Sequence, residues 1–273
     1  SLREAVERKG ARIVVFEVAG VIDLGRRTLA IREPNLTLAG QTAPSPGITL
    51  IRGGLAVATH DVVIQHLRVR PGEAGAAKMS DWEVDGLSTG GGARDVIVDH
   101  CSFTWATDEN LSASGPRFAG NTPEEWRNGA SRRITFSHNI IAEGLANATH
   151  PKGEHSKGSL IHDNVTDVFI AANLYAHNME RNPLFKGGAR GIVVNNLIYN
   201  PGPRAVHYNL IREEWTDRPA VTGSVALIGN VLRSGPSTPA DIALFQLGGS
   251  GDVELFLSDN ISVDRLGAPL PGL

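Results

Sequence analysis

Two cations flank a proline in the segment Arg181–Gly188 (RNPLFKGG), where Arg181 and Lys186 lie five residues apart. The segment follows one strand-like stretch, Val168–Tyr175, and precedes another, Gly191–Asn200. Cations held at fixed spacing on a stiff, extended chain can bind carboxylates through charge-assisted hydrogen bonds. This spacing therefore favours an anionic polymer with regularly repeated carboxylates as the ligand.

Two longer segments between strands are expected to add further polar groups to the same region. The first, Trp105–Arg132, begins with the acidic pair Asp108 and Glu109. The second, Glu143–Leu160, contains a cluster of basic side chains, namely Lys152, His155 and Lys157. Long turns of a repetitive fold usually protrude on one face and form its binding face. We expect both segments to line one groove with Arg181.

Composition limits the possible classes of protein. The chain has 273 residues and a formal charge of −3, so no global positive field favours nucleic acid. Cys101 is the single cysteine, which rules out an intramolecular disulfide. Apolar runs stay well below the roughly 20 residues that cross a bilayer, so no membrane partner is expected. Ser1–Arg8 has the pattern of a helix interior rather than a leader peptide.

Strand-like segments recur with alternating β-branched residues, followed by an asparagine. The asparagines recur at intervals of 23 to 34 residues, at Asn139, Asn173, Asn196, Asn230 and Asn260. Two earlier copies, Val62–Leu67 and Val96–Cys101, carry other residues at this position. Self-similarity at such a period indicates a solenoid in which each repeat buries its apolar face against its neighbours.

The repeats predict an all-β fold, a parallel β-helix whose stacked turns pair their backbones. One short helical pattern, Pro123–Asn128, interrupts them. The corner asparagines are expected to adopt left-handed φ/ψ values and to donate their amides along a stack. A β-propeller also repeats, but its blade signatures are missing. A helix over Leu2–Lys9 is expected to cap the open end.

Three sequence blocks carry a family resemblance. They are Val96–Phe103 (VIVDHCSF), His155–Leu160 (HSKGSL) and Arg181–Lys186 (RNPLFK). In this order they resemble blocks of the pectate lyases of polysaccharide lyase family 1, and the likeness runs from about Val15 to Asn200. The resemblance implies a single-stranded right-handed parallel β-helix, with 1–273 as one lyase domain.

The resemblance also implies the chemistry. Pectate lyases cleave polygalacturonate by β-elimination, in which a base removes the proton at C5 and the 4-O-glycosidic bond breaks, leaving a 4,5-unsaturated uronate. It implies that Arg181 is the base. Its expected neighbours Lys157 and Lys186 can neutralise substrate carboxylates, and His155 and Lys152 are expected to contact substrate, with an ordinary loop position as the alternative for both. Arginine normally stays protonated, so we expect burial and the cations Lys157 and Lys186 to lower the pKa of Arg181.

The chain departs from the family pattern at two places. Lys186 stands where the family has arginine, which keeps the charge but loses the bidentate fork. In the first stretch of the calcium site, after Asp85, Ser88 and Gly90 stand where acidic ligands are expected. In the second stretch, Asp108 matches one acidic position, whereas Ser112 replaces the other. Calcium prefers about six to eight oxygen ligands, so we expect Asp108, Asp85 and Glu109 to bind it together with substrate carboxylates. A metal-free reaction is the alternative.

Other functions remain open at this stage. A lyase for methylated pectin would not need calcium, and an inverting polygalacturonase on this fold would need clustered aspartates. A non-catalytic carbohydrate-binding solenoid is the alternative outside the enzymes. In that case Arg181 would be an ordinary charge paired with Glu180 or Asp167.

Several weaker expectations complete the prediction. His150 and His155 with Glu154 lack a convincing third zinc ligand, and Asp99 with His100 is expected to pin a turn beneath the groove. Cys101 is expected to be a buried apolar group. A polymer substrate favours a secreted or periplasmic location, and solenoids are often monomers. A guanidine base favours an alkaline optimum.

Overall fold

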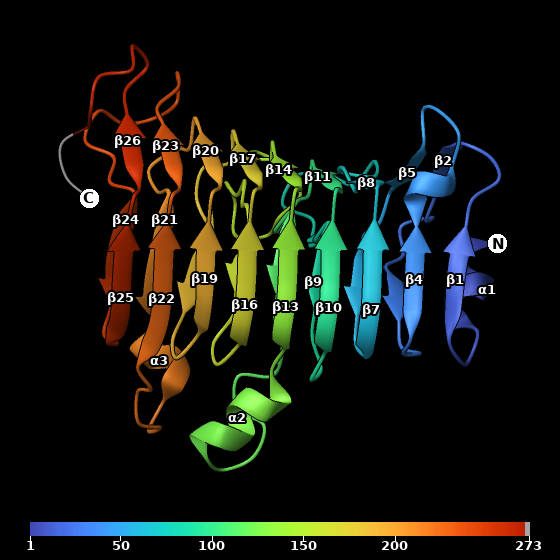
Figure 1. The fold of residues 1–273 in the computed structure, drawn as a ribbon, viewed down its shortest axis with the longest axis horizontal. Coiled ribbons are helices and arrows are strands. Elements are labelled where there is room, and N and C mark those ends of the chain that lie inside the picture. Colours follow the sequence, from blue (N-terminus) through green and yellow to red (C-terminus); the bar gives the residue numbers. More distant parts are fainter. Residues whose placement is uncertain (271–273) are drawn as a thin grey trace.

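A computed structural model describes residues 1–270 and consists of three parallel sheets that run side by side along one axis (Figure 1). Each strand pairs in parallel with the strand of the same sheet in the next turn. This arrangement is a right-handed parallel β-helix, which confirms the predicted fold. Because every turn of chain visits the three sheets in order, residues at one corner stack from turn to turn.

Sheets A and B carry nine strands each. Sheet A contains β1 (Arg12–Val15), β4 (Leu36–Ala39), β7 (His60–Gln65), β10 (Arg94–Asp99), β13 (Arg132–Ser137), β16 (Thr166–Ala171), β19 (Arg190–Val194), β22 (Gly223–Ile228) and β25 (Val253–Ser258). Sheet B contains β2 (Gly20–Asp23), β5 (Ile48–Ile51), β8 (Leu67–Arg70), β11 (Ser102–Thr104), β14 (Ile140–Ala142), β17 (Leu174–Ala176), β20 (Leu197–Tyr199), β23 (Val231–Arg233) and β26 (Ile261–Val263).

Sheet C has eight strands and was not distinguished from the sequence. It contains β3 (Leu29–Ile31), β6 (Leu55–Val57), β9 (Leu87–Thr89), β12 (Leu111–Ala113), β15 (Leu160–Ile161), β18 (Leu184–Lys186), β21 (Val206–Leu210) and β24 (Phe245–Gly249). Its strands are short, and the connections that lead into them vary in length. The two long segments noted in the sequence each lead into a strand of this sheet, Trp105–Arg132 into β12 and Glu143–Leu160 into β15.

The predicted strand pattern is confirmed by burial in sheet A. In β13, Ile134 and Phe136 are fully buried, and in β16 Val168 and Ile170 are buried at the paired positions. Side chains alternate across a strand, so these residues fill the interior while their neighbours face outward. The apolar alternation seen in the sequence therefore defines the core of the solenoid.

The predicted asparagine stack is confirmed at the corner between sheets A and B. Each side-chain amide donates to the Oδ1 atom of the next asparagine at 2.9–3.1 Å, through Asn139, Asn173, Asn196, Asn230 and Asn260. These side chains are buried or nearly so, and each Oδ1 also accepts a backbone N–H. Cys101, 3% exposed, extends the stack, since its N–H donates to Asn139.

The expectation that these asparagines adopt left-handed φ/ψ values is wrong. The left-handed position is the residue before each stacked side chain: His100, His138, Ala172, Asn195, Gly229 and Asp259 have φ between 52° and 64°. The turn reverses the chain at that residue, which leaves the next side chain pointing into the stack. At this corner, one residue therefore adopts the left-handed backbone conformation, and the next residue provides the hydrogen-bonding side chain.

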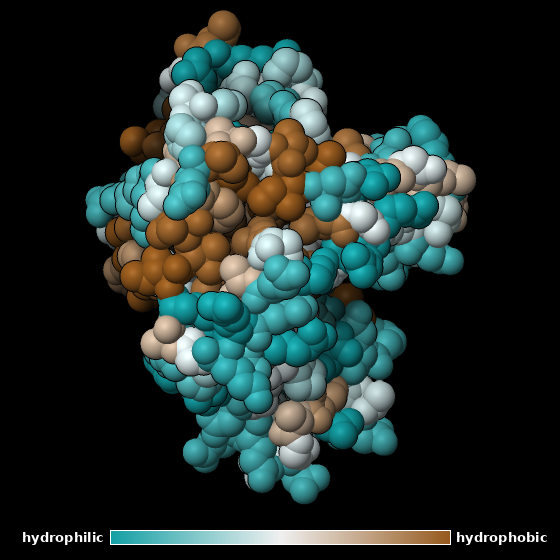
Figure 2. All heavy atoms as spheres, turned by 90° about the vertical axis from the view of Figure 1, so that its right-hand side faces the viewer, coloured by the Kyte–Doolittle hydropathy of each residue, from teal (hydrophilic) through white to brown (hydrophobic). Residues whose placement is uncertain are grey.

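The N-terminal helix α1 (Leu2–Glu7) is shorter than the predicted Leu2–Lys9. Ser1 and Glu4 form a capping box, and the buried Val6 anchors the helix, which packs against β3. Figure 2 shows apolar side chains still gathered at this end of the molecule. The exposed apolar residues of the first turn are Ile13, Val15, Val18 and Val21. The helix therefore covers only part of this end.

The other helices are short and lie in connections between strands, the first between sheets A and B and the other two between sheets C and A. They are η1 (Gly40–Thr42), α2 (Pro123–Gly129) and α3 (Arg212–Trp215). The helix predicted over Pro123–Asn128 is confirmed as α2, and Figure 1 shows α2 and α3 at the same end of the strands. No helix within residues 1–270 has the length and apolarity needed to traverse a bilayer.

Candidate active site

The predicted site residues gather at the corner where the chain passes from sheet B into sheet C. Glu109, Lys157 and Glu180 occupy this corner in successive turns and are joined by parallel backbone bridges. Asp85 lies one turn earlier, and its Oδ1 accepts the backbone N–H of Glu109 at 3.1 Å. Charged side chains far apart in sequence are therefore stacked on one ridge.

A close backbone approach positions Arg181 on this ridge. The N–H of Gly158 donates to Glu180 at 3.1 Å, and the N–H of Ser159 donates to the Arg181 carbonyl at 2.6 Å. A Cβ atom on Gly158 would lie only 2.4 Å from that carbonyl oxygen. Glycine is therefore required beside Arg181, whose own φ of 64° is in the left-handed region.

A second, unpredicted asparagine stack lies behind the site. Asn110 donates to Asn178 and Asn178 donates to Asn182, both at 3.1 Å, and all three side chains are buried. Asn110 follows Glu109 and Asn182 precedes Pro183, so the stack fixes the backbone next to both Glu109 and Arg181. Buried amide networks of this kind hold a backbone rigid when every group is paired.

A cleft of about 420 Å³ opens above this corner. Six of the predicted residues line it, namely Arg181, Lys186, Lys152, His155, Asp108 and Glu109. Lys157 and Asp85 lie on the ridge beneath, in contact with cleft residues. The sequence reasoning missed further lining residues, among them Arg117, Glu180, Arg204, His207 and Glu214. The two predicted long segments and the Arg181 segment thus meet in one groove.

Arg181 is mostly buried, with 23% of its side chain exposed, and its Nη1 pairs with Oε1 of Glu109. Burial lowers the pKa of Arg181, as expected, whereas the nearby charges of Asp108, Asp85 and Glu214 act to raise it. The expectation that neighbouring cations contribute to the lowering is therefore wrong. The partner of Arg181 is Glu109 rather than Glu180 or Asp167.

Lys157 is paired with a carboxylate of the neighbouring turn. Its Nζ contacts Oε1 of Glu180, whose other oxygen accepts from Arg204 at 3.0 Å. Burial acts to raise the pKa of Glu180, but the hydrogen bond and charge of Lys157 outweigh it, so this pKa lies below its usual range. Glu180 therefore stays ionised and holds two cations at the cleft.

Lys186 is held in a buried charge cluster. Its Nζ contacts Glu214 and lies 3.5 Å from Oδ2 of the fully buried Asp163. Arg117 bonds both carboxylates, with Nε at 2.9 Å from Asp163 and Nη2 at 2.6 Å from Glu214. The Nε1 of Trp215 donates to Asp163 at 2.8 Å. Two cations thus share two carboxylates at the edge of the cleft.

An aromatic cluster supports these charges from below. Phe118, Trp126 and Trp215 pack edge to face, with ring centroids 5.0–6.1 Å apart. Phe118 follows Arg117 and Trp215 follows Glu214, so packing of α2 against α3 places both charged side chains. Helices from two separate turns are therefore needed to build one wall of the cleft.

Asp108 is held by two stacked imidazoles. His155 Nε2 lies 2.8 Å from Asp108 Oδ1, and His150 Nε2 lies 3.2 Å from Glu83 and 3.6 Å from Asp108. The two rings stack with centroids 3.6 Å apart. Burial acts to raise the pKa of Asp108, but the hydrogen bond from His155 and the charges around it hold the pKa below its usual range.

The geometry argues against zinc at this pair of histidines. Glu154 is exposed and is not part of the cluster, in which Asp108 takes its place. The backbone N–H of Lys152 donates to Nδ1 of His150 at 3.1 Å. The neutral ring of His150 then carries its proton on Nε2, which makes that nitrogen a donor to the carboxylates rather than a metal ligand.

Three carboxylates form an oxygen-rich group suited to calcium. Oxygen atoms of Asp85, Asp108 and Glu109 lie within 4.8 Å of one another. Burial and the charge of Asp108 raise the pKa of Asp85 well above its usual value, which a bound cation would reverse. Ser112 lies in β12, where its hydroxyl accepts the N–H of Leu160 at 3.2 Å. The donor set fits calcium with further ligands from water or substrate.

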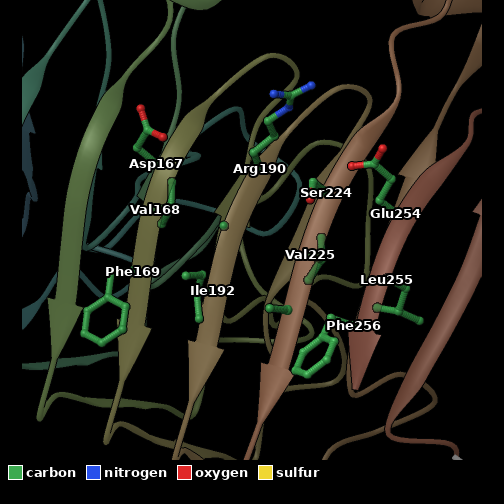
Figure 3. Close-up of a pocket in the computed structure, with 12 residues that line it drawn as sticks. Asp167, Val168, Phe169, Arg190, Ile192, Ser224, Val225, Glu254, Leu255 and Phe256 are labelled. Atoms are coloured by element: carbon green, nitrogen blue, oxygen red, sulfur yellow. The ribbon is translucent and has the colours of Figure 1, made fainter. Parts of the chain in front are cut away.

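A larger cavity, of about 630 Å³, lies on the outer face of sheet A. Figure 3 shows Phe169, Ile192 and Phe256 along this cavity, on β16, β19 and β25, and Phe169 and Ile192 are paired in register. Its centre is apolar and charged side chains are confined to one margin, at Asp167, Arg190 and Glu254. The smaller, polar cleft is the better match for a carboxylated ligand.

Two other predicted features lie away from the cleft. Asp99 accepts from Nδ1 of His100 at 2.7 Å and of His138 at 3.1 Å, at the corner between sheets A and B. Asp99 and His100 therefore stabilise a turn as predicted, but the turn lies at a different corner of the solenoid from the cleft. The buried state predicted for Cys101 is confirmed, and burial raises the pKa of its thiol to about 12.

Comparison with known proteins identifies sequence relatives. No protein-family model matches the chain. The chain is 33% identical over 241 residues to a probable pectate lyase C of Aspergillus flavus, covering 87% of this chain and 48% of that protein. It is 35% identical over 205 residues to the protein of that name from Aspergillus oryzae, covering 74% and 41%. The chain thus spans about half the length of the curated relatives it matches.

Solved structures give the same fold at low sequence identity. The pectate lyase Bsp165PelA from Bacillus sp. N165, in complex with trigalacturonate, gives a TM-score of 0.62 at 14% identity, over 95% of this chain and 77% of that chain. A double mutant of the periplasmic alginate epimerase AlgG gives 0.50 at 12% identity, over 86% and 46%. These structures establish the fold alone. The sequence relatives confirm the resemblance: over 87% of its length, the chain is homologous to about half of a probable pectate lyase C.

Proposed function

We propose that this chain is a pectate lyase, which cleaves α-1,4-linked polygalacturonate by β-elimination and uses calcium. The observation that carries the proposal is a mostly buried arginine, Arg181, placed in a polar cleft with Lys186 and Arg117. The pectate lyase relatives and the neighbouring structure with bound trigalacturonate support the same substrate class. A secreted or periplasmic location follows from the size of such a polymer.

Arg181 is the proposed base. Its guanidine takes the proton from C5, the electron pair forms the C4–C5 double bond, and the C4–O bond breaks. The leaving oxygen takes up a proton, so the products are a 4,5-unsaturated uronate and a free hydroxyl group. The burial that lowers the pKa of Arg181 favours the neutral guanidine that this step needs.

The neighbouring cations are proposed to bind and polarise uronate carboxylates. Lys186 and Arg117 lie side by side on Glu214, so together they offer an ammonium and a guanidinium to one carboxylate. Lys157 lies on the ridge beneath the cleft, and Lys152 and His155 line the cleft from the Glu143–Leu160 segment. Lys152 forms no ion pair within residues 1–270 and is exposed, which leaves its charge available to substrate.

Asp85, Asp108 and Glu109 are proposed to hold calcium, with the remaining ligands supplied by water and substrate carboxylates. Calcium in this place would neutralise uronate charge and favour loss of the C5 proton. His155 and His150 would keep Asp108 oriented by their hydrogen bonds.

A second candidate is a lyase for methylated pectin, and one observation favours it. Arg181, Lys157 and Lys186 are each paired with a carboxylate, so the cleft has much less free positive charge than its basic residues imply. A neutral methyl ester would suit such a cleft. The clustered carboxylates of Asp85 and Asp108 would then have no cation to bind.

The two substrates are separated by one assay. Polygalacturonate and highly methylated pectin are incubated with the protein, and the ultraviolet absorbance of the unsaturated product is followed with chelator and after calcium is restored. A pectate lyase yields product from polygalacturonate only when calcium is present. Product from methylated pectin despite chelator supports the second candidate, and no product from either substrate refutes both.

Arg181→Ala tests the base, with Arg204→Ala as its matched control. Both arginines line the cleft and both pair with a glutamate, but Arg204 is half-exposed and lies one turn away. Loss of a base costs about two to four orders of magnitude in rate, whereas Arg204→Ala should retain most of the activity. Equal rates for Arg181→Ala and wild type, with the fold intact by circular dichroism, refute the role.

A further inference from the structure

Glu109 has two possible partners. Its Oε1 pairs with Nη1 of Arg181, and its carboxylate also belongs to the oxygen-rich group with Asp85 and Asp108. Only 4% of the Glu109 side chain is exposed, so water cannot readily replace either partner. One carboxylate therefore lies between the proposed base and the proposed cation site.

The two partners repel each other. A guanidinium that contacts Glu109 and a cation that shares its oxygens would be two positive charges a few ångströms apart, in a mostly buried place. Such charges interact more strongly there than in water. Binding a cation at Asp85, Asp108 and Glu109 is thus opposed for as long as Arg181 stays on Glu109.

Of the two paired side chains, that of Arg181 is freer to move than that of Glu109. Glu109 is fixed by the bond from its N–H to Asp85 and by Asn110, whose amide is buried in the second asparagine stack. The Arg181 side chain is long and 23% exposed, and it lines the open cleft. Arg181 can therefore leave Glu109 by turning toward the cleft, whereas Glu109 has no comparable freedom.

We propose that Glu109 is a positioning residue that holds Arg181 in the metal-free protein and releases it to the cleft when a divalent cation takes the carboxylate. The inference rests on the proposed function, since it assigns calcium to this carboxylate group. The competition is reciprocal, so an anionic ligand that draws Arg181 away from Glu109 strengthens cation binding by the same factor. Cation and uronate would then bind cooperatively through one ion pair.

The test measures calcium affinity and does not depend on turnover. Isothermal titration calorimetry follows calcium binding to metal-stripped wild type, Arg181→Gln and the control Arg204→Gln. Both variants remove one cleft guanidinium, but Arg204 pairs with Glu180 and not with the oxygen-rich group. We expect Arg181→Gln to bind calcium at least about five-fold more tightly than wild type, the lower end of ordinary coupling between sites. Arg204→Gln should give a clearly smaller gain.

The proposal is overturned if Arg181→Gln gains no more affinity than Arg204→Gln, or if neither wild type nor Arg181→Gln binds calcium. Arg181→Ala repeats the measurement if circular dichroism shows that Arg181→Gln is misfolded. Lyase activity of wild type on polygalacturonate is recorded with the same preparation. Activity with unchanged calcium affinities refutes the role of Glu109 and leaves the proposed function intact, whereas absent activity refutes the function itself.

Discussion

Replacing Asn178 by alanine should destabilise the fold and damage the site together. Its side chain donates to Ile141 at 2.9 Å and Asn182 at 3.1 Å, and accepts from Asn110 at 3.1 Å and Gly144 at 3.0 Å. In the variant, Oδ1 of Asn182 and the N–H of Gly144 lose these partners in a buried place. Each unsatisfied group costs about 1–3 kcal/mol, so the free energy of unfolding should fall by about 2–6 kcal/mol.

Asn173→Ala is the matched control. Asn173 lies in the same turn of the solenoid, is similarly buried and also makes four side-chain hydrogen bonds, but at the corner between sheets A and B. Both variants should lose comparable stability in urea unfolding. At a temperature where both remain folded, Asn178→Ala should lose about ten- to a hundred-fold in kcat/KM, because Arg181 is displaced. Asn173→Ala should stay near wild type.

Two results would refute this reasoning. A loss of less than about 1 kcal/mol for Asn178→Ala would mean that its partners find other hydrogen bonds. Equal kcat/KM values for Asn178→Ala and Asn173→Ala would mean that the second asparagine stack does not position Arg181.

Three further predictions concern the same region. Gly158→Ala places a Cβ 2.4 Å from the Arg181 carbonyl and should lower both lyase rate and melting temperature, with Gly90→Ala, an open position without a positive φ, as control. Burial lowers the pKa values of His162 and His207 to about 4. Both bind protons more readily when unfolded, so stability in urea unfolding should fall from about pH 6.5 toward pH 4, by up to about 3 kcal/mol each. Lyase rate should rise into the alkaline range, and an optimum below about pH 6 would contradict Arg181 as base.

Much of the fold was predictable because its signals are local in the sequence. Alternating apolar residues define the strands of sheet A, and the recurring asparagine marks the corner that follows. The left-handed residue before it was not predictable, since His138, Ala172 and Asp259 all occupy that position. Backbone geometry selects the conformation there, and no single residue type reports it. Sheet C was missed because strands such as β15, with two residues, are too short to show a period.

The site was predictable in its basic residues and not in their partners. Sequence blocks indicated Arg181, Lys157 and Lys186, but the carboxylates that pair with the lysines are Glu180 and Glu214, 23 and 28 residues away. These distances correspond to one turn of a solenoid, and turn length varies along the chain. The register between turns, which decides every pairing, is fixed only when the strands are stacked. The signal that could have suggested these two carboxylates is an acidic residue about one turn of the solenoid after each lysine.

The ridge of Glu109, Lys157 and Glu180 also holds its charges at a fixed spacing. Adjacent turns are separated by the spacing of hydrogen-bonded strands, about 4.8 Å, so the interval between these charges is set by the main chain. Substitution of a side chain can change its charge or its length, but not the distance between adjacent turns. Changing the distance between these charged positions requires a whole turn of the solenoid to be inserted or removed. The separation of the charges is therefore the property of the groove that point substitutions change least.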